Sequence, residues 1–176
     1  RFVDGAYCQL KPGYIATLTD YHKTLAQRNA LLRQARESSA SVNGVEEMLQ
    51  LWDNTLAVAG ARITRAREHY IRRLEPLAAA VYAGLSGDRE RLTLRWDSPA
   101  TVEGGTPADV AHKWLELLGQ SRRADMAAGF TTVGAHREDL CIEIDGLSVK
   151  TFGSQGQQRS AVLALKLAEA SLLQEV

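Results

Sequence analysis

The sequence has few of the features that mark a membrane, disulfide-linked or strongly charged protein. No run of about 18 apolar residues is present, so no membrane span is expected. The only cysteines, Cys8 and Cys141, stand far apart and outside any metal-ligand spacing, which favours reduced thiols and no metal site. Lys plus Arg and Asp plus Glu both number 21, so the net charge is zero. Any binding to nucleic acid must therefore come from a local basic patch.

Two motifs of nucleotide hydrolysis are also missing. No Gly-x-x-x-x-Gly-Lys-Ser/Thr loop occurs that would hold phosphates, and no apolar strand ends in the paired acids that hold Mg²⁺. The chain alone is not expected to hydrolyse ATP. The sequence opens without a methionine or a signal-peptide pattern, and a helical pattern still runs at Val176. We therefore expect both ends to continue in a longer protein.

Apolar residues at helical spacing dominate the first half. A first helix is expected over about 14–41, after the boundary at Pro12 and Gly13, and a second over 45–82. The short link at Asn43–Gly44 makes the two helices antiparallel neighbours, and Pro76 is expected to kink or interrupt the second. The second helix keeps a coiled-coil-like apolar seam. The seam consists of Val45, Leu49, Trp52, Leu56, Ala59, Ile63, Ala66, Tyr70, Leu74, Leu77 and Val81.

The second half alternates between strand and helix patterns. Strands are expected over 91–96 and 130–133, and a hairpin over 140–152 is expected to turn at Asp145–Gly146. Thr106 is a good cap for a helix that starts at Pro107. A last helix, from about Gln157, carries apolar residues on more than one face and is expected to be well buried.

The predicted fold class is α+β, with a long antiparallel helical hairpin beside a small sheet-and-helix lobe. We expect an arm over residues 1–84 and a lobe over 85–176. Within the lobe, the hairpin 140–152 precedes a loop and helix over 153–176.

The segment from Gly153 to Arg159 lies between a predicted strand and a predicted helix. A helix start offers unpaired backbone N–H groups and the positive end of the helix dipole. Glycine lets a ligand come close, and the Ser154 hydroxyl adds a donor, so this loop suits a phosphate. A plain cap and turn is the alternative interpretation.

The same segment, with the helix that follows as far as Glu169, resembles the RecF form of the ABC-ATPase signature motif. Ser154, Gly156 and Gln157 match the Ser, second Gly and Gln of Leu-Ser-Gly-Gly-Gln. Gln155 replaces the first Gly, a departure from most ABC proteins that is typical of RecF.

Two further stretches resemble the RecF family. Residues 134–140, Gly-Ala-His-Arg-Glu-Asp-Leu, are similar to its Gly-Pro-His-Arg-Asp-Asp-Leu, from which Ala135 and Glu138 depart. The opening Arg1–Asp4 and the segment Gln27–Leu32 resemble the stretch that leads into the family's arm. The matches span nearly the whole chain in the family's order.

The resemblance implies action in trans. Two RecF subunits hold ATP, with Mg²⁺, between them, and each signature loop closes on the nucleotide held by the other. The loop residues are Ser154, Gln155, Gly156, Gln157, Gln158 and Arg159. Ser154 would donate to the γ-phosphate, with help from the N–H groups of Gly156 and Gln157.

The resemblance also implies a cellular process and its partners. The family binds double-stranded DNA next to gaps and, with RecR and RecO, helps RecA to load during recombinational repair, with links to replication and the SOS response. A cytoplasmic protein associated with the nucleoid is the corresponding location.

Several basic residues are candidates for contact with nucleotide or DNA. His136 and Arg137 are one pair, for which structural bonding to Glu138, Asp139 or loop carbonyls is the alternative. Arg62, Arg65 and Arg72 share one stripe of the second helix and suit a DNA backbone, for which a solvated helix face or pairing with Glu37 is the alternative.

Two other functions remain open from the sequence. One is another SMC-like ATPase such as RecN, whose arm is far longer than the roughly 70 residues available here. The other is a non-enzymatic helical module for protein interaction, in which Ser154 and Gly156 only cap a helix.

Overall fold

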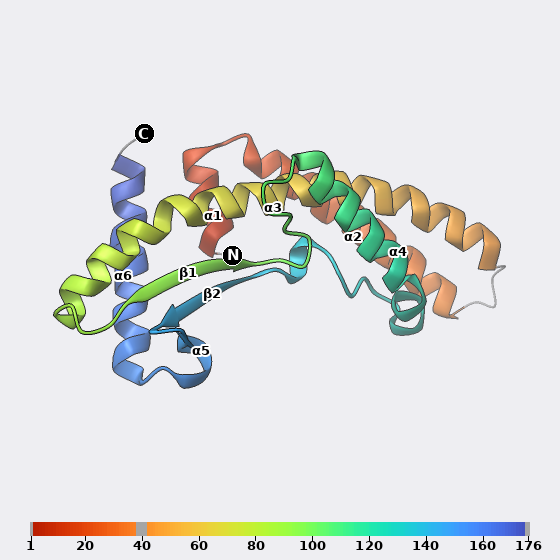
Figure 1. Cartoon of the computed structure of the whole chain (residues 1–176). Coiled ribbons are helices and arrows are strands. Elements are labelled where there is room, and N and C mark those ends of the chain that lie inside the picture. Colours follow the sequence, from red (N-terminus) through yellow and green to blue (C-terminus); the bar gives the residue numbers. More distant parts are fainter. Residues whose placement is uncertain (1, 38–41, 175–176) are drawn as a thin grey trace. The chain divides into compact units, whose positions relative to one another are not determined.

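A computed structural model describes residues 2–37 and 42–174, and the side chains of 42 and 43 are not described. The elements are labelled in Figure 1. The helices are α1 (Phe2–Leu10), α2 (Tyr14–Glu37), α3 (Val42–Ser86), α4 (Pro107–Ala128), the 3-10 turn η1 (Ala135–Arg137), α5 (Val149–Phe152) and α6 (Gln155–Gln174). The strands are β1 (Leu92–Asp97), β2 (Asp139–Ile144) and β3 (Leu147–Ser148). No helix within these described ranges is long and apolar enough to cross a membrane.

The chain forms two compact units that interleave along the sequence. The lobe unit contains residues 1–12, 66–97 and 139–176, and the arm unit contains 13–65 and 98–138. Helix α3 supplies its first part to the arm unit and its second part to the lobe unit. Each unit thus takes segments from both sides of the division predicted at residue 84.

The lobe unit is built around a three-stranded antiparallel sheet in the order β1-β2-β3. The predicted turn is confirmed: Asp145 and Gly146 both have positive φ, at 50° and 79°, as a tight hairpin requires. Apolar residues of the sheet pack with residues of α1, the second part of α3, α5 and α6. This core includes Val3, Ala6, Tyr70, Leu74, Tyr82, Leu92, Leu94, Ile144, Ala164, Leu165 and Leu172.

The arm unit packs α2, the first part of α3 and α4 together. Leu32 of α2 is fully buried with Leu49 of α3, whereas Arg28 meets Asp53 and Tyr21 lies beside Gly60. Earlier residues of α2 thus meet later residues of α3, so the two helices are antiparallel, as predicted. Their connection at 38–41 lies outside the described residues.

The helix that starts after Thr106 forms as expected, with a reciprocal capping box between Thr106 and Asp109. Helix α3 (Val42–Ser86) contains Asn43–Gly44, so the link predicted at these two residues is wrong. The helix also runs through Pro76 without a break, so the predicted interruption there is wrong. Helix α2 is described as far as Glu37, and its predicted continuation to residue 41 lies outside the described residues.

Several expectations for the remaining segments need correction. Helix α1 was not predicted, although Val3, Ala6 and Leu10 recur at helical spacing and are buried. The second hairpin strand was predicted over 147–152, but only Leu147–Ser148 pairs and α5 follows. The predicted strand at 130–133 does not form, because the backbone N–H groups of Thr131 and Thr132 donate to side chains of Asn29 and Asp125 instead.

Helix α6 starts two residues before the predicted Gln157, and it is buried on one face only. Ala161, Ala164 and Leu165 face the core, whereas Val162 and Leu163 are 58% and 47% exposed. The expectation that α6 is buried on more than one face is therefore wrong within the described residues.

Candidate functional site

The signature loop lies between α5 and α6, in the lobe unit. The Cβ of any residue larger than glycine at 153 would lie 2.5 Å from the carbonyl oxygen of Val149, so this position requires a glycine. Ser154 follows as the cap of α6. Its backbone N–H donates to Gln157 Oε1 at 2.9 Å, and the Gln157 N–H donates to Ser154 Oγ at 3.2 Å. This reciprocal pairing is a capping box, and it orients the first turn of α6.

The capping box decides which groups remain available to an anion. The N–H of Gln158 donates to the Ser154 carbonyl oxygen. The N–H of Gln157, which was expected to help bind the phosphate, donates to Ser154 Oγ instead, so that expectation needs correction. The N–H groups of Gln155 and Gly156 belong to the first turn, which has no intrahelical partner for them. Ser154 Oγ accepts one bond and keeps its own proton to donate. A phosphate would thus meet two amides and one hydroxyl at the positive end of a 20-residue helix.

The surroundings of this loop are open. A Cβ at Gly156 would meet nothing closer than Ser154 Oγ at 3.8 Å, so a ligand has room there. A polar hollow of about 510 Å³ is lined by residues including Arg89, Glu90, Gly156 and Gln157. Gln155, Gln158 and Arg159 are exposed and border a second hollow of about 630 Å³ along α6. Gln158 also donates to the carbonyl oxygen of Gly153 at 3.0 Å, which ties it to the loop.

A carboxylate outside the motif contacts the loop. Glu90 Oε1 accepts a hydrogen bond from Gln157 Nε2 at 2.9 Å, and Glu90 Oε2 accepts one from the Tyr82 hydroxyl at 2.6 Å. The bond from Tyr82 and then the bond from Gln157 lower the pKa of Glu90. The pKa of Tyr82 is raised, mainly because the ring is buried. Sequence reasoning missed Glu90, since no motif includes it.

In the arm unit, His136 and Arg137 have different surroundings. His136 Nδ1 lies 2.9 Å from the Tyr21 hydroxyl, and Nε2 lies 3.3 Å from the Thr131 carbonyl oxygen. Burial lowers the pKa of His136, which favours the neutral ring at pH 7. Arg137 is exposed, with its guanidinium 5.8 Å from the centre of the Phe130 ring. Within the described residues, Arg137 is the member of the pair that solvent or a ligand can reach.

The residues that depart from the family pattern near His136 are inward-facing. Ala135 is 1% exposed, and Glu138 Oε1 accepts a hydrogen bond from Thr64 Oγ1 at 2.5 Å. The same Thr64 oxygen accepts from Trp114 Nε1 at 3.0 Å. Glu138 thus ties the end of this loop to α3 and α4.

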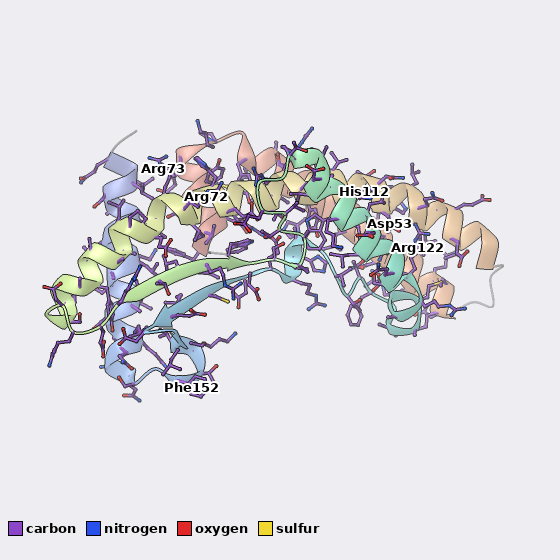
Figure 2. The ribbon with its side chains drawn as sticks, in the orientation of Figure 1. Asp53, Arg72, Arg73, His112, Arg122 and Phe152 are labelled. Carbon is purple, nitrogen blue, oxygen red and sulfur yellow. The ribbon has the colours of Figure 1, made fainter. Side chains whose placement is uncertain are left out.

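A buried charge cluster of Arg28, Asp53, Asp125 and Arg122 holds the arm unit together, and the sequence interpretation did not foresee it. Arg28 donates to Asp53 and Asp125, at 2.7 Å each, and all three side chains are 0% exposed. Arg122 donates to the other oxygen of Asp53 from α4 (Figure 2). One sequence feature could have indicated this cluster: the charged residue Asp53 lies between the apolar seam positions 49 and 56.

The arginine stripe of α3 is uneven. Arg62 and Arg72 are exposed, whereas Arg65 is half-buried and has other interactions. Arg67, next to the stripe, is buried against Asp4 at 2.8 Å and over the Trp96 ring. Arg72 and Arg73 extend from adjacent positions in the lobe unit (Figure 2), and both lower the pKa of His69, for which burial is the larger cause. The described residues hold no group of three side chains fit to bind a metal ion.

Comparison with known proteins gives a consistent family. No protein-family profile matches the chain. The DNA replication and repair protein RecF of Thermosynechococcus vestitus is 41% identical over 176 residues, which is 100% of this chain and 45% of that protein. The RecF of Rippkaea orientalis is 39% identical over 182 residues, 100% of this chain and 48% of the relative. The chain therefore spans about half the length of the curated relatives it matches.

Solved structures agree with this result. A structure described as the recombination mediator protein RecF-ATPrS in the RecFOR pathway has a TM-score of 0.90 and 32% identity. The match covers 99% of this chain and 46% of the RecF chain in that structure. The corresponding RecF-ATP structure has a TM-score of 0.89 and 31% identity.

Proposed function

Since the chain belongs to the RecF family and spans about half the length of its curated relatives, we propose that its signature loop closes on ATP held by a partner subunit. The observation that carries this proposal is the exposed capping box of α6. It leaves the Ser154 hydroxyl and the N–H groups of Gln155 and Gly156 at the helix start, where a terminal phosphate would be bound. The remaining contacts to ATP, and those to Mg²⁺, would come from segments outside this chain.

The ligand dependence follows from the donors involved. ADP lacks the γ-phosphate, so it offers these donors no partner, and the two subunits should separate after hydrolysis. This behaviour would make the pair of subunits an ATP-controlled clamp on double-stranded DNA. Gapped DNA as its target, and RecR, RecO and RecA as its functional partners, are part of the same proposal.

Ser154→Arg tests the proposal in the RecF-length protein that contains this chain. A bulky cation at the cap fills the place of the phosphate, so we expect ATP-dependent dimerisation to be lost while binding of ATP by each subunit persists. Light scattering after size exclusion, with ATP and with ADP, measures dimerisation. Binding of a fluorescent nucleotide measures the affinity of each subunit for ATP. Ser171→Arg, on an exposed position of the same helix, is the control. Unchanged dimerisation of Ser154→Arg would favour the protein-interaction module instead.

A second expected contact involves the stripe of Arg62, Arg65 and Arg72. We propose that these residues contact DNA phosphates, supported by the exposure of Arg62 and Arg72. Reversal of all three to Glu should lower duplex affinity at least roughly tenfold and reduce the salt dependence by about one unit of slope per lost contact. Fluorescence anisotropy at several salt concentrations measures both, with Arg33→Glu on α2 as control. An affinity that does not change with the triple reversal would remove the stripe from the DNA interface.

A further inference from the structure

The side chain of Gln157 is held at both ends of its amide group. Its Oε1 accepts from the Ser154 N–H, and its Nε2 donates to Glu90 Oε1, each at 2.9 Å. Only one orientation of the amide satisfies both bonds, because Glu90 accepts and the Ser154 N–H donates. The conformation of the capping box thus depends on a carboxylate 67 residues earlier in the chain.

Glu90 is itself held by the core of the lobe unit. Its second carboxylate oxygen accepts from the Tyr82 hydroxyl at 2.6 Å, and the Tyr82 residue is 1% exposed. Between them, Gly87 and Asp88 have positive φ, at 65° and 58°, which turns the chain sharply after α3. The Ser86 hydroxyl lies 3.4 Å from the Glu90 carbonyl oxygen. Core, turn and carboxylate therefore form one continuous support for Gln157.

We propose that Glu90 is a positioning residue for the signature loop. Its carboxylate links the fixed Tyr82 hydroxyl to the Gln157 amide, and Gln157 in turn holds Ser154. The importance of Glu90 for ATP rests on the function proposed above, but its effect on the loop does not. Without Glu90, the Gln157 amide is free to rotate, the Ser154 N–H loses its acceptor, and the Ser154 hydroxyl is no longer aimed by the capping box.

A swap of the two side chains tests this pairing. Gln157→Glu alone places two carboxylates at hydrogen-bond distance, and Glu90→Gln alone leaves one oxygen for two donors. The double variant reverses the bond. The amide introduced at position 90 would donate to the carboxylate introduced at position 157 and accept from Tyr82, and that carboxylate would still accept from the Ser154 N–H.

The expected readout is hydrogen exchange of the Ser154 and Gln157 backbone amides, which the capping box protects. We expect each single variant to speed this exchange at least roughly tenfold, and the double variant to return within about threefold of the parent. Exchange is measured by NMR on the 176-residue chain, with the exposed Glu103→Gln as the matched loss of a carboxylate. Single variants that leave exchange unchanged, or a double variant without recovery, would overturn the positioning role.

Dimerisation with ATP in the RecF-length protein then separates the two proposals. The double variant should have an ordered loop and still dimerise poorly, because its carboxylate at position 157 repels the phosphate. Full dimerisation with a recovered loop would contradict the function proposed for the loop and leave the positioning role intact.

Discussion

Arg28→Met is expected to destabilise the arm unit by about 3–5 kcal/mol, because it leaves the buried Asp125 carboxylate without a cation and removes one of the two cations that pair with Asp53. Arg28 binds Asp53 and Asp125 at 2.7 Å each, and its Nη1 also donates to Thr131 Oγ1 at 2.9 Å. Asp53 keeps Arg122, but Asp125 keeps only neutral donors. Methionine fills much of the same volume, so the change removes charge with little loss of packing.

Urea unfolding followed by circular dichroism measures the change in the free energy of unfolding. Two variants complete a graded series. Arg122→Met removes a partner whose side chain is 25% exposed and should cost clearly less, since Asp53 keeps Arg28 and the Arg122 charge is already partly solvated. Arg33→Ala, on an exposed position of α2, should stay within about 0.5 kcal/mol of the parent. A loss below about 1 kcal/mol for Arg28→Met would show that Asp53 and Asp125 find other compensation.

Gly134→Ala is the second change with a large expected effect, at least about 2 kcal/mol of destabilisation. Gly134 has φ 143° and ψ 175°, a region that side chains rarely enter. A Cβ there would lie 2.6 Å from the Tyr21 hydroxyl and 2.9 Å from His136 Nδ1. Alanine would therefore strain the backbone and separate Tyr21 from His136.

Gly119→Ala is the matched control for Gly134→Ala. Gly119 lies within α4, where a Cβ would meet nothing within 4 Å, so alanine should stabilise by up to about 1 kcal/mol. The two substitutions thus have opposite expected signs in the same unit. NMR titration of His136 adds a local readout: its pKa, lowered by burial, should rise toward the ordinary value when Gly134→Ala exposes the ring. Equal stabilities of the two variants would contradict the geometry of this loop.

The sequence predicted features that depend on local spacing. The capped start of α4 and the turn at Asp145–Gly146 each depend on residues close together in the chain, and each is present. The signature loop was also found from local residues, and its binding role stays a prediction. Local patterns failed where a segment's partner is distant: Thr131 and Thr132 read as a strand, but side chains of Asn29 and Asp125 take their backbone N–H groups.

The sequence by itself determined the fold class, the family and the residues at the start of α6. Only the tertiary structure decided how that start is supported, because the Gln157–Glu90 and Arg28–Asp125 bonds join residues 67 and 97 positions apart. It also distinguished His136 from Arg137, which the motif places side by side. Burial of His136 beside Tyr21 favours its neutral ring, whereas the Arg137 side chain is exposed. Desolvation and hydrogen bonding depend on what surrounds a side chain, and that environment is assembled from segments that share no local pattern.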